Sequence, residues 1–440
     1  MNNNIEKIFG RHAATDSRNV KSGGVFIALE GERVDGHDYI DQAIANGAEI
    51  IIVRKGKRPK KIYDNKIEFI ELDEPELDLA NIASQRLINN KNLKHVIAVT
   101  GSVGKTTTRE AVKLVLSKKF KVHAAEQSFN TRIGCTCTVL AMPEETEILL
   151  LEFGANKPGE ILELTQLFAP DIAVITQVAP VHLEGFKSIE GVLSGKLEIL
   201  KSKRVKKFLY NADNKLLSDA KLDAKLEKFG VGFNGLDFKI NDVKFNFDDK
   251  SGMPLLKFKL NDAEIAAAVW GEHNAYPLAF AAAIGEILGV NDFADSLNKF
   301  APLDGRGRIY RLDKLNLILI DDAYNANPAS MRASLETFIN INCEFKKLAV
   351  LGEMREMGDN AVKYHAELAD LFNKLDLVIL VGKLWREAVK ERENILFAAD
   401  WHEALEIINN KINNNYMALL KGSHSIGLQN IARELINKNA

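Results

Sequence analysis

The sequence predicts an α/β protein of three domains built around a central, largely parallel sheet. Short apolar runs alternate with helix-like segments along most of the chain, which is typical of parallel strands covered by helices. One apolar run leads directly into a glycine-containing turn and a helix. Residues 236–270 instead alternate apolar and polar positions, which indicates antiparallel strands. We therefore expect a central domain with an antiparallel appendage, flanked by two α/β domains.

Length and composition set the class of protein. A chain of 440 residues is too long for one ordinary core, so two to four domains are expected, and we predict three. With 46% hydrophobic and 27% charged residues, the composition is that of a globular protein. The net charge of -2 gives no overall field that would attract nucleic acid or an anionic membrane. We expect no nucleic-acid partner.

The N-terminal segment and the cysteines indicate the compartment. The first ten residues, MNNNIEKIFG, contain no basic region followed by a long apolar stretch, and no window reaches the roughly 18 apolar residues that span a bilayer. Cys135, Cys137 and Cys343 are an odd set without zinc-site spacing, which indicates reduced thiols. The expectation is a cytoplasmic protein without membrane insertion.

Domain boundaries are expected near residues 92 and 302. In residues 1–92, two apolar runs at 25–29 and 50–53 enclose a helix-like segment, and an asparagine-rich patch at 89–92 ends this small α/β domain. Residues 93–301 form the central domain, with buried strands expected at 96–100, 147–153 and 171–178 and with the appendage turning at 248–252. Residues 302–440 form a Rossmann-like α/β domain, with apolar runs at 317–320, 348–351, 377–381 and 417–420.

The strongest chemical signal is a P-loop in the central parallel sheet. An apolar run from Val96 is followed by Thr100-Gly101-Ser102-Val103-Gly104-Lys105-Thr106-Thr107. Glycines let backbone N–H groups approach phosphate oxygens, the helix N-terminus adds partial positive charge, Lys105 can reach the β- and γ-phosphates, and Thr106 can bind Mg²⁺. Val99 stands where the general pattern has glycine. Nucleotide binding is predicted, but the loop alone does not choose among ligase, kinase, GTPase and motor.

Other segments carry a resemblance over essentially the whole chain. They are Glu152-Phe153-Gly154-Ala155-Asn156, His182-Leu183-Glu184-Gly185-Phe186, Gly271-Glu272-His273-Asn274, Asp321-Asp322-Ala323-Tyr324-Asn325-Ala326-Asn327-Pro328, Leu351-Gly352-Glu353-Met354 and Lys421-Gly422-Ser423. Together with the P-loop they resemble the Mur ligases, ATP-dependent enzymes that build the muramoyl peptide one amide at a time. The run that begins at Asp321 is similar to that of the branch adding D-alanyl-D-alanine to UDP-N-acetylmuramoyl tripeptide.

The resemblance implies an activity and a metal site. ATP would convert the carboxylate of UDP-N-acetylmuramoyl tripeptide to an acyl phosphate, and the amine of D-alanyl-D-alanine would then attack it, giving ADP, phosphate and the pentapeptide. Because the carboxylate and the triphosphate are both anions, two Mg²⁺ ions are implied. The implied catalytic residues are Lys105, Glu152, His182 and Lys196, and the implied metal ligands are Thr106, Glu152, His182 and Lys196. Lys196 matches the family lysine that carries a carbamate.

The resemblance also implies binding residues on all three domains, and a monomer. Residues implied to hold ATP, besides the P-loop, are Asn274, Arg308, Asp322, Asn325 and Asn327. Arg306 lies two positions from Arg308 and is an alternative for the same role. Residues implied to contact the UDP-sugar are Ser17, Arg18, Asp35, Gly36 and His37. The active site would then be a cleft between domains.

Some details and rival functions stay open at this point. Thr131, Gln177 and Pro277 depart from the family pattern, and His424 stands where members often have arginine. The sequence does not choose between diaminopimelate and lysine as the third peptide residue. The rivals are the ligase that adds that third residue, a folate polyglutamate synthase, and a regulatory P-loop switch. The 321–328 run argues against the first two.

Overall fold

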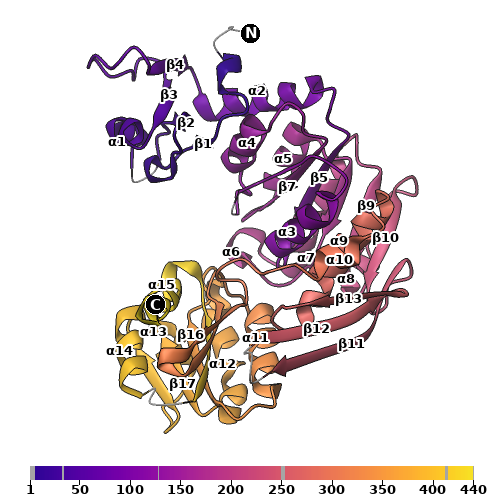
Figure 1. The fold of residues 1–440 in the computed structure, drawn as a ribbon, viewed down its shortest axis with the longest axis vertical. Helices are drawn as coiled ribbons and strands as arrows, with labels where there is room; N and C mark the ends of the chain where they lie inside the picture. The colour runs from indigo at the N-terminus through magenta and orange to yellow at the C-terminus, as the bar shows by residue number, and fades with distance from the viewer. Residues whose placement is uncertain (1–4, 32–33, 127, 249–252, 412–414, 440) are drawn as a thin grey trace.

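Three sheets organise the chain in the computed structural model, which describes residues 5–31, 34–126, 128–248, 253–411 and 415–439. Figure 1 shows them as three lobes in chain order: the first at the upper left, the middle at the right and the third at the lower left. The predicted α/β class with a parallel-rich central sheet is confirmed. Within those ranges, no helix combines the length and the apolarity needed to cross a bilayer.

The first lobe contains a four-stranded parallel sheet in the order β1-β2-β3-β4. Its elements are β1 (Ala13–Ala14), β2 (Gly24–Ile27), α1 (Ile40–Ala45), β3 (Ala48–Arg54), β4 (Glu68–Leu72) and α2 (Pro75–Asn89). Strands β2 and β3 are the two predicted apolar runs. The other two strands carry weak patterns, because β1 is two residues long and β4 is mostly half-buried.

The middle lobe contains a nine-stranded sheet in the order β13-β12-β11-β10-β9-β8-β5-β7-β6. Its strands are β5 (His95–Thr100), β6 (Val122–Ala124), β7 (Ile148–Glu152), β8 (Ile172–Ile175), β9 (Lys207–Asn211), β10 (Glu227–Gly232), β11 (Phe238–Asp248), β12 (Met253–Leu260) and β13 (Ala263–Ala267). Pairing is parallel from β6 across to β11 and antiparallel from β11 to β13, as the alternation in residues 236–270 indicates. Residues 249–252 of its predicted turn lie outside the described ranges.

Helices cover both faces of the middle sheet. They are α3 (Lys105–Leu116), α4 (Arg132–Ala141), α5 (Glu160–Phe168), α6 (Leu183–Phe186), α7 (Ile189–Leu197), α8 (Lys215–Ser218), α9 (Ala275–Ile287) and α10 (Phe293–Leu297). Alternate residues of β5 enter different cores: Val96 packs in the cluster that includes α5, and Ile97 packs in the cluster that includes α3 and α9. This two-sided burial explains why β5 reads as a continuous apolar run.

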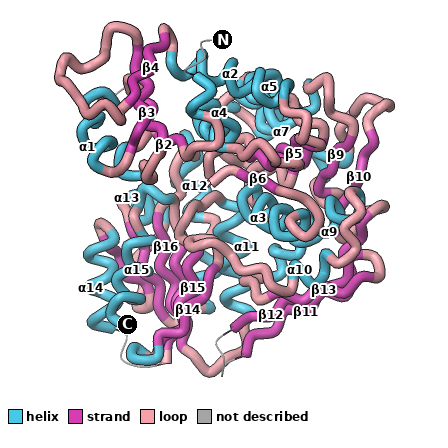
Figure 2. Tube along the Cα trace, turned by 45° about the horizontal axis from the view of Figure 1, so that its top comes forward, coloured by secondary structure: helices cyan, strands magenta, loops and turns pink. Residues whose placement is uncertain are grey.

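The third lobe contains a six-stranded sheet in the order β14-β15-β19-β16-β17-β18, in which only β14 is antiparallel to its neighbour. Its elements are β14 (Arg308–Leu312), β15 (Leu317–Asp322), α11 (Pro328–Asn340), β16 (Lys346–Gly352), α12 (Ala361–Ala366), β17 (Leu377–Val381), α13 (Lys383–Ala388), β18 (Ile395–Ala398), α14 (Trp401–Lys411), β19 (Tyr416–Lys421) and α15 (Leu428–Asn439). Helices α11 and α14 pack on opposite faces of this sheet (Figure 2).

A buried arginine ties the first lobe to the middle lobe. Arg86 of α2 is 7% exposed, and its guanidinium donates to the backbone carbonyls of Val139, Leu140 and Met142 at the C-terminal end of α4. These carbonyls carry the partial negative charge of a helix end, so a cation is well placed there. The ring of Phe9 lies 4.5 Å from the guanidinium carbon.

Arg86→Met should therefore destabilise the protein, because it keeps an apolar stem but leaves buried carbonyls without donors. We expect a loss of about 3 kcal/mol, measured as a lower melting temperature by calorimetry. Arg204→Met is the matched control, since Arg204 is half-exposed and its pairing with Asp171 is loose at 3.6 Å. Equal melting temperatures for the two variants would contradict a structural role for Arg86.

Candidate active site

A cleft of about 1190 Å³ is lined by residues that follow the carboxyl ends of strands in both the middle and the third sheets. From the middle lobe it receives the loops after β5, β7 and β8, and from the third lobe the residues at the ends of β15 and β19. Ligands of α/β proteins commonly bind outside the carboxyl ends of parallel strands. The cleft is therefore the candidate site.

The predicted P-loop forms the floor of the cleft. It connects β5 to α3, with Gly101 at φ +143° and Gly104 at φ +83°. A Cβ atom at Gly101 would lie 2.2 Å from Oγ1 of Thr176, so only glycine fits this close approach. Ser102, Val103, Gly104, Lys105, Thr106 and Thr107 line the cleft. The ammonium of Lys105 donates to the carbonyl of Gly101 at 2.9 Å, and burial lowers the pKa of Lys105.

Two predicted metal ligands meet beside the loop. Thr106 Oγ1 donates to Glu152 Oε2 at 2.8 Å, and Asn130 Nδ2 donates to Glu152 Oε1 at 3.1 Å. Thr106 and Glu152 are each 1% exposed, yet both line the cleft. Because the Thr106 hydroxyl is the donor in its hydrogen bond to the carboxylate, the lone pairs of its oxygen remain available to a cation. These oxygen donors are the type that Mg²⁺ prefers, so the residues fit such an ion.

The other two predicted ligands differ in their access to the cleft. His182, the residue before α6, lines the cleft, and its Nδ1 pairs with Glu356 from the loop after β16 in the third lobe. Lys196 on α7 is 1% exposed and is not among the cleft-lining residues. Its ammonium lies 5.6 Å from the ring centroid of Phe186, and burial, followed by the charge of Lys105, lowers the pKa of Lys196 to about 7.

The third lobe contributes a buried ion pair to the cleft wall. Asp322 ends β15, and Lys421 ends β19 opposite it in the parallel register. Lys421 Nζ donates to Asp322 Oδ2 at 2.7 Å and to the carbonyl of Asn325 at 3.2 Å, and Ser334 Oγ donates to the same carboxylate oxygen at 2.6 Å. Asn325 and Asn327 also line the cleft, and the Asn327 side chain caps α11 by accepting from Ser330 N at 2.9 Å. Lys421 is not among the site residues predicted from the sequence.

Of the two candidate arginines, Arg306 lines the cleft and Arg308 does not. The guanidinium carbon of Arg306 lies 4.0 Å from the Tyr324 ring centroid, and its Nη2 donates to Ser128 Oγ at 2.9 Å. Arg308 begins β14 and pairs with Asp304, with a side chain that is 48% exposed. The structure thus favours the alternative that the two-residue spacing left open.

Residues that depart from the family pattern have local roles. Thr131 caps α4 by accepting from Gly134 N at 3.4 Å, and Gln177 accepts from Asn211 Nδ2 at 2.9 Å. Gln177, Pro277 and His424 line the cleft. Asn274, predicted to hold nucleotide, also lines the cleft, and its amide donates to the carbonyl of Trp270.

The predicted UDP-sugar residues of the first lobe do not line this cleft. Ser17 Oγ donates to Gln42 Oε1 at 2.6 Å, and the exposed Arg18 pairs with Asp16. Asp35 precedes the turn formed by Gly36 and His37, where a Cβ on Gly36 would lie 2.8 Å from the backbone of Leu29. The structure therefore does not bring this group together with the P-loop.

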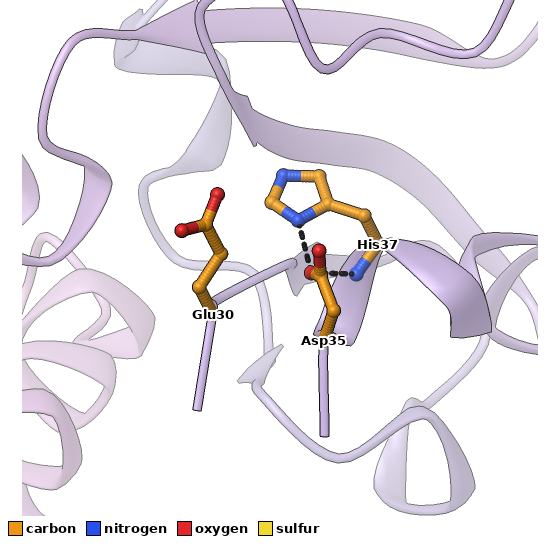
Figure 3. Close-up of side chains that lie close together, drawn as sticks. All are labelled: Glu30, Asp35 and His37. Carbon is orange, nitrogen blue, oxygen red and sulfur yellow. Dashed lines mark hydrogen bonds and ion pairs between the residues drawn. The ribbon is translucent and has the colours of Figure 1, made fainter. Parts of the chain in front are cut away.

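Glu30, Asp35 and His37 lie close together in that turn (Figure 3), and their ligand atoms fall within 4.8 Å of one another. Both ring nitrogens of His37 are engaged, because Nδ1 bonds Asp35 Oδ1 at 2.6 Å and Nε2 accepts from Arg54 N at 3.3 Å. The ammonium of Lys57 lies 3.3 Å from Glu30 and 3.4 Å from Asp35. Hydrogen bonds to His37 lower the pKa of Asp35 to about 2. The set is a charge-paired turn, and we assign it no metal ion.

Sequence comparison agrees with the geometry of the cleft. Three family profiles match consecutive segments: "Mur ligase family, catalytic domain" at residues 12–98, "Mur ligase middle domain" at 99–285 and "Mur ligase, glutamate ligase domain" at 307–424. Relatives that carry the name "UDP-N-acetylmuramoyl-tripeptide--D-alanyl-D-alanine ligase" include proteins from Bacillus subtilis and Rickettsia prowazekii. The one from Bacillus subtilis is 32% identical over 96% of this chain and 92% of its own length. The one from Rickettsia prowazekii is 31% identical over 94% and 93%.

Structural comparison gives the same result. A MurF ligase from Thermotoga maritima, solved in complex with ADP, superposes with a TM-score of 0.80 at 27% identity, over 98% of this chain and 99% of its own. The resemblance inferred from the motifs is confirmed, and the chain belongs to the Mur ligase family.

Proposed function

We propose that the protein joins D-alanyl-D-alanine to UDP-N-acetylmuramoyl tripeptide and converts ATP to ADP and phosphate. The observation that carries this proposal is the cleft, in which the P-loop and the Thr106–Glu152 pair of the middle lobe lie with Asp322 and Lys421 of the third lobe. Relatives bearing this activity in their names align over nearly the whole chain, and a structural neighbour contains ADP. This likeness supports the ligase over a regulatory P-loop switch.

The reaction has two steps that the cleft can accommodate. A carboxylate oxygen of the tripeptide forms a bond to the γ-phosphorus as the bond to the ADP oxygen breaks. The dipeptide nitrogen then attacks the carbonyl carbon, phosphate leaves with the C–O electron pair, and the nitrogen loses a proton. Lys105 and the loop N–H groups would hold the phosphates, and Arg306 would offer forked donors to their oxygens. The negative triphosphate would favour the protonated form of Lys105 that burial disfavours.

Thr106 and Glu152 would hold one Mg²⁺, and His182 would help to hold a second, after its release from Glu356. Bound Mg²⁺ supplies charge neutralisation between the triphosphate and the attacking carboxylate. For Lys196, a pKa near 7 supports a carbamate, because only the neutral amine attacks CO₂. That step forms an N–C bond, places a negative charge on oxygen and releases one proton. The carbamate would turn a buried cation into an anion near the P-loop.

We further propose domain boundaries near residues 92 and 302 and a UDP-sugar site at Ser17, Arg18, Asp35, Gly36 and His37. The three sheets lie within residues 13–72, 95–267 and 308–421, which supports the boundaries. For the UDP-sugar site, the support is the exposed guanidinium of Arg18, whose forked donors suit a diphosphate. The UDP end would then lie outside the cleft, with the peptide extending into it.

The test is the dependence of ADP formation on both acceptor and donor. We expect ADP release only when UDP-N-acetylmuramoyl tripeptide and D-alanyl-D-alanine are both present, with a matching amount of pentapeptide by mass spectrometry. Equal ADP release with either omitted would refute the ligase and favour the switch. Running the assay with diaminopimelate and with lysine at the third position identifies the preferred tripeptide.

A further inference from the structure

A buried arginine that lies outside the cleft, and that is not among the predicted site residues, contacts the carboxylate of Glu152. Arg109 of α3 is completely buried, and its Nη1 donates to Glu152 Oε2 at 3.2 Å. Thr106 donates to the same oxygen. Thr106 and Arg109 are three residues apart, so they lie on one face of the helix and present a hydroxyl and a guanidinium to one carboxylate.

Two further donors of Arg109 are occupied by its neighbour in sequence. Its Nε and Nη2 donate to Glu110 Oε1 at 3.1 and 2.7 Å. Glu110 is 22% exposed, and neither Arg109 nor Glu110 lines the cleft. The three side chains therefore form a row, Glu110–Arg109–Glu152, that runs from the edge of the lobe to the wall of the cleft.

The charges of this row explain how a cation can contact a predicted metal ligand without cancelling its negative charge. An unpaired guanidinium at this distance would neutralise Glu152 and repel a divalent ion in the same region. The pairing with Glu110 balances Arg109, so the row as a whole keeps one negative charge. The fork of Arg109 grips Glu110, which aims its Nη1 at one oxygen of Glu152, while Asn130 fixes the other oxygen.

We propose that Arg109 and Glu110 are positioning residues that orient Glu152 toward the nucleotide-bound metal ion and preserve its negative charge. This inference deepens the proposed function and rests on its metal site. Replacing a group that hydrogen-bonds to a metal ligand commonly changes metal affinity by about 10- to 100-fold. Arg109 and Glu110 act on the ion only through Glu152.

Two complementary substitutions separate geometry from charge. Arg109→Lys keeps the positive charge but removes the planar fork, and Glu110→Gln keeps the shape but leaves Arg109 unbalanced. We expect each to weaken Mn²⁺ binding by about 10- to 100-fold, measured by electron paramagnetic resonance in the presence of saturating ADP. ADP binding in EDTA should stay within about twofold of the parent protein, because the P-loop contacts to phosphate are unchanged.

Matched controls exclude a general loss of stability. Glu147→Gln removes another partly buried carboxylate, paired with Lys94 just before the opposite end of β7, and should leave Mn²⁺ affinity unchanged. Arg86→Lys perturbs a second buried arginine away from the cleft and should lower only the melting temperature. Normal Mn²⁺ affinity in folded Glu110→Gln, or an equal loss in Glu147→Gln, would overturn the proposal. Because Mn²⁺ binding is measured without the tripeptide, failure of this proposal can be distinguished from failure of the proposed ligase function.

Discussion

Lys105→Ala is expected to lower ligase turnover by on the order of 10³-fold or more, the largest effect of any single substitution considered. Lys105 starts α3, lies in the cleft floor, and donates to the carbonyl of Gly101. Its ammonium is thus held over the loop, where the triphosphate would replace the carbonyl as its partner. Alanine removes this charge at the point where negative charge develops during phosphoryl transfer.

The measurement is kcat for ADP release with all three substrates saturating. Lys113→Ala is the control, because Lys113 lies on the same helix but is exposed and distant from the loop, and it should retain parent activity. Near-normal kcat in Lys105→Ala would show that the loop does not act on the transferred phosphoryl group.

Lys196→Ala should lower kcat by on the order of 10²- to 10³-fold, because it removes the group that would carry the carbamate. Lys196 is almost fully buried, so the truncation leaves a space that a small anion can enter. We expect a short carboxylic acid to restore part of the activity, and bicarbonate to restore less. Lys201→Ala, an exposed lysine at the end of the next helical turn, should be active without any additive. Rescue by neither anion would leave Lys196 as a bare buried lysine.

The fold was predictable where a local pattern was strong. Strands β5, β7 and β8 are apolar on both faces, and the phosphate loop has its residues in consecutive order. Strand β14 was missed because the exposed Arg308 and Arg311 interrupt its short apolar pattern. Such edge strands are recognised from the strand with which they pair, and this pairing depends on the tertiary structure.

The site residues likewise fall into those that a local motif predicts and those that depend on the tertiary structure. Glu152 was predictable from its motif, whereas Arg109 was not, because its partner is 43 residues away and depends on β5 and β7 being neighbours. The pair formed by Asp322 and Lys421 likewise spans 99 residues and follows from the β15–β19 register. Arg306 lies between Gly305 and Gly307, both at positive φ, whereas Arg308 begins β14, and the sequence alone does not show which of the two arginines reaches the cleft.

The distribution of apolar clusters makes the joints between lobes unequal in strength. The first and middle lobes share one continuous cluster of buried apolar side chains, which includes Ile52 of β3 and Leu149 of β7. The third lobe has clusters of its own, one of which includes Trp270 and has Phe245 and Phe247 of β11 packed against it, and polar pairs such as Arg306 with Ser128 also join the two lobes. Water can replace polar pairs at little cost. The joint to the third lobe therefore draws fewer core side chains from the middle lobe than the joint between the first two lobes does.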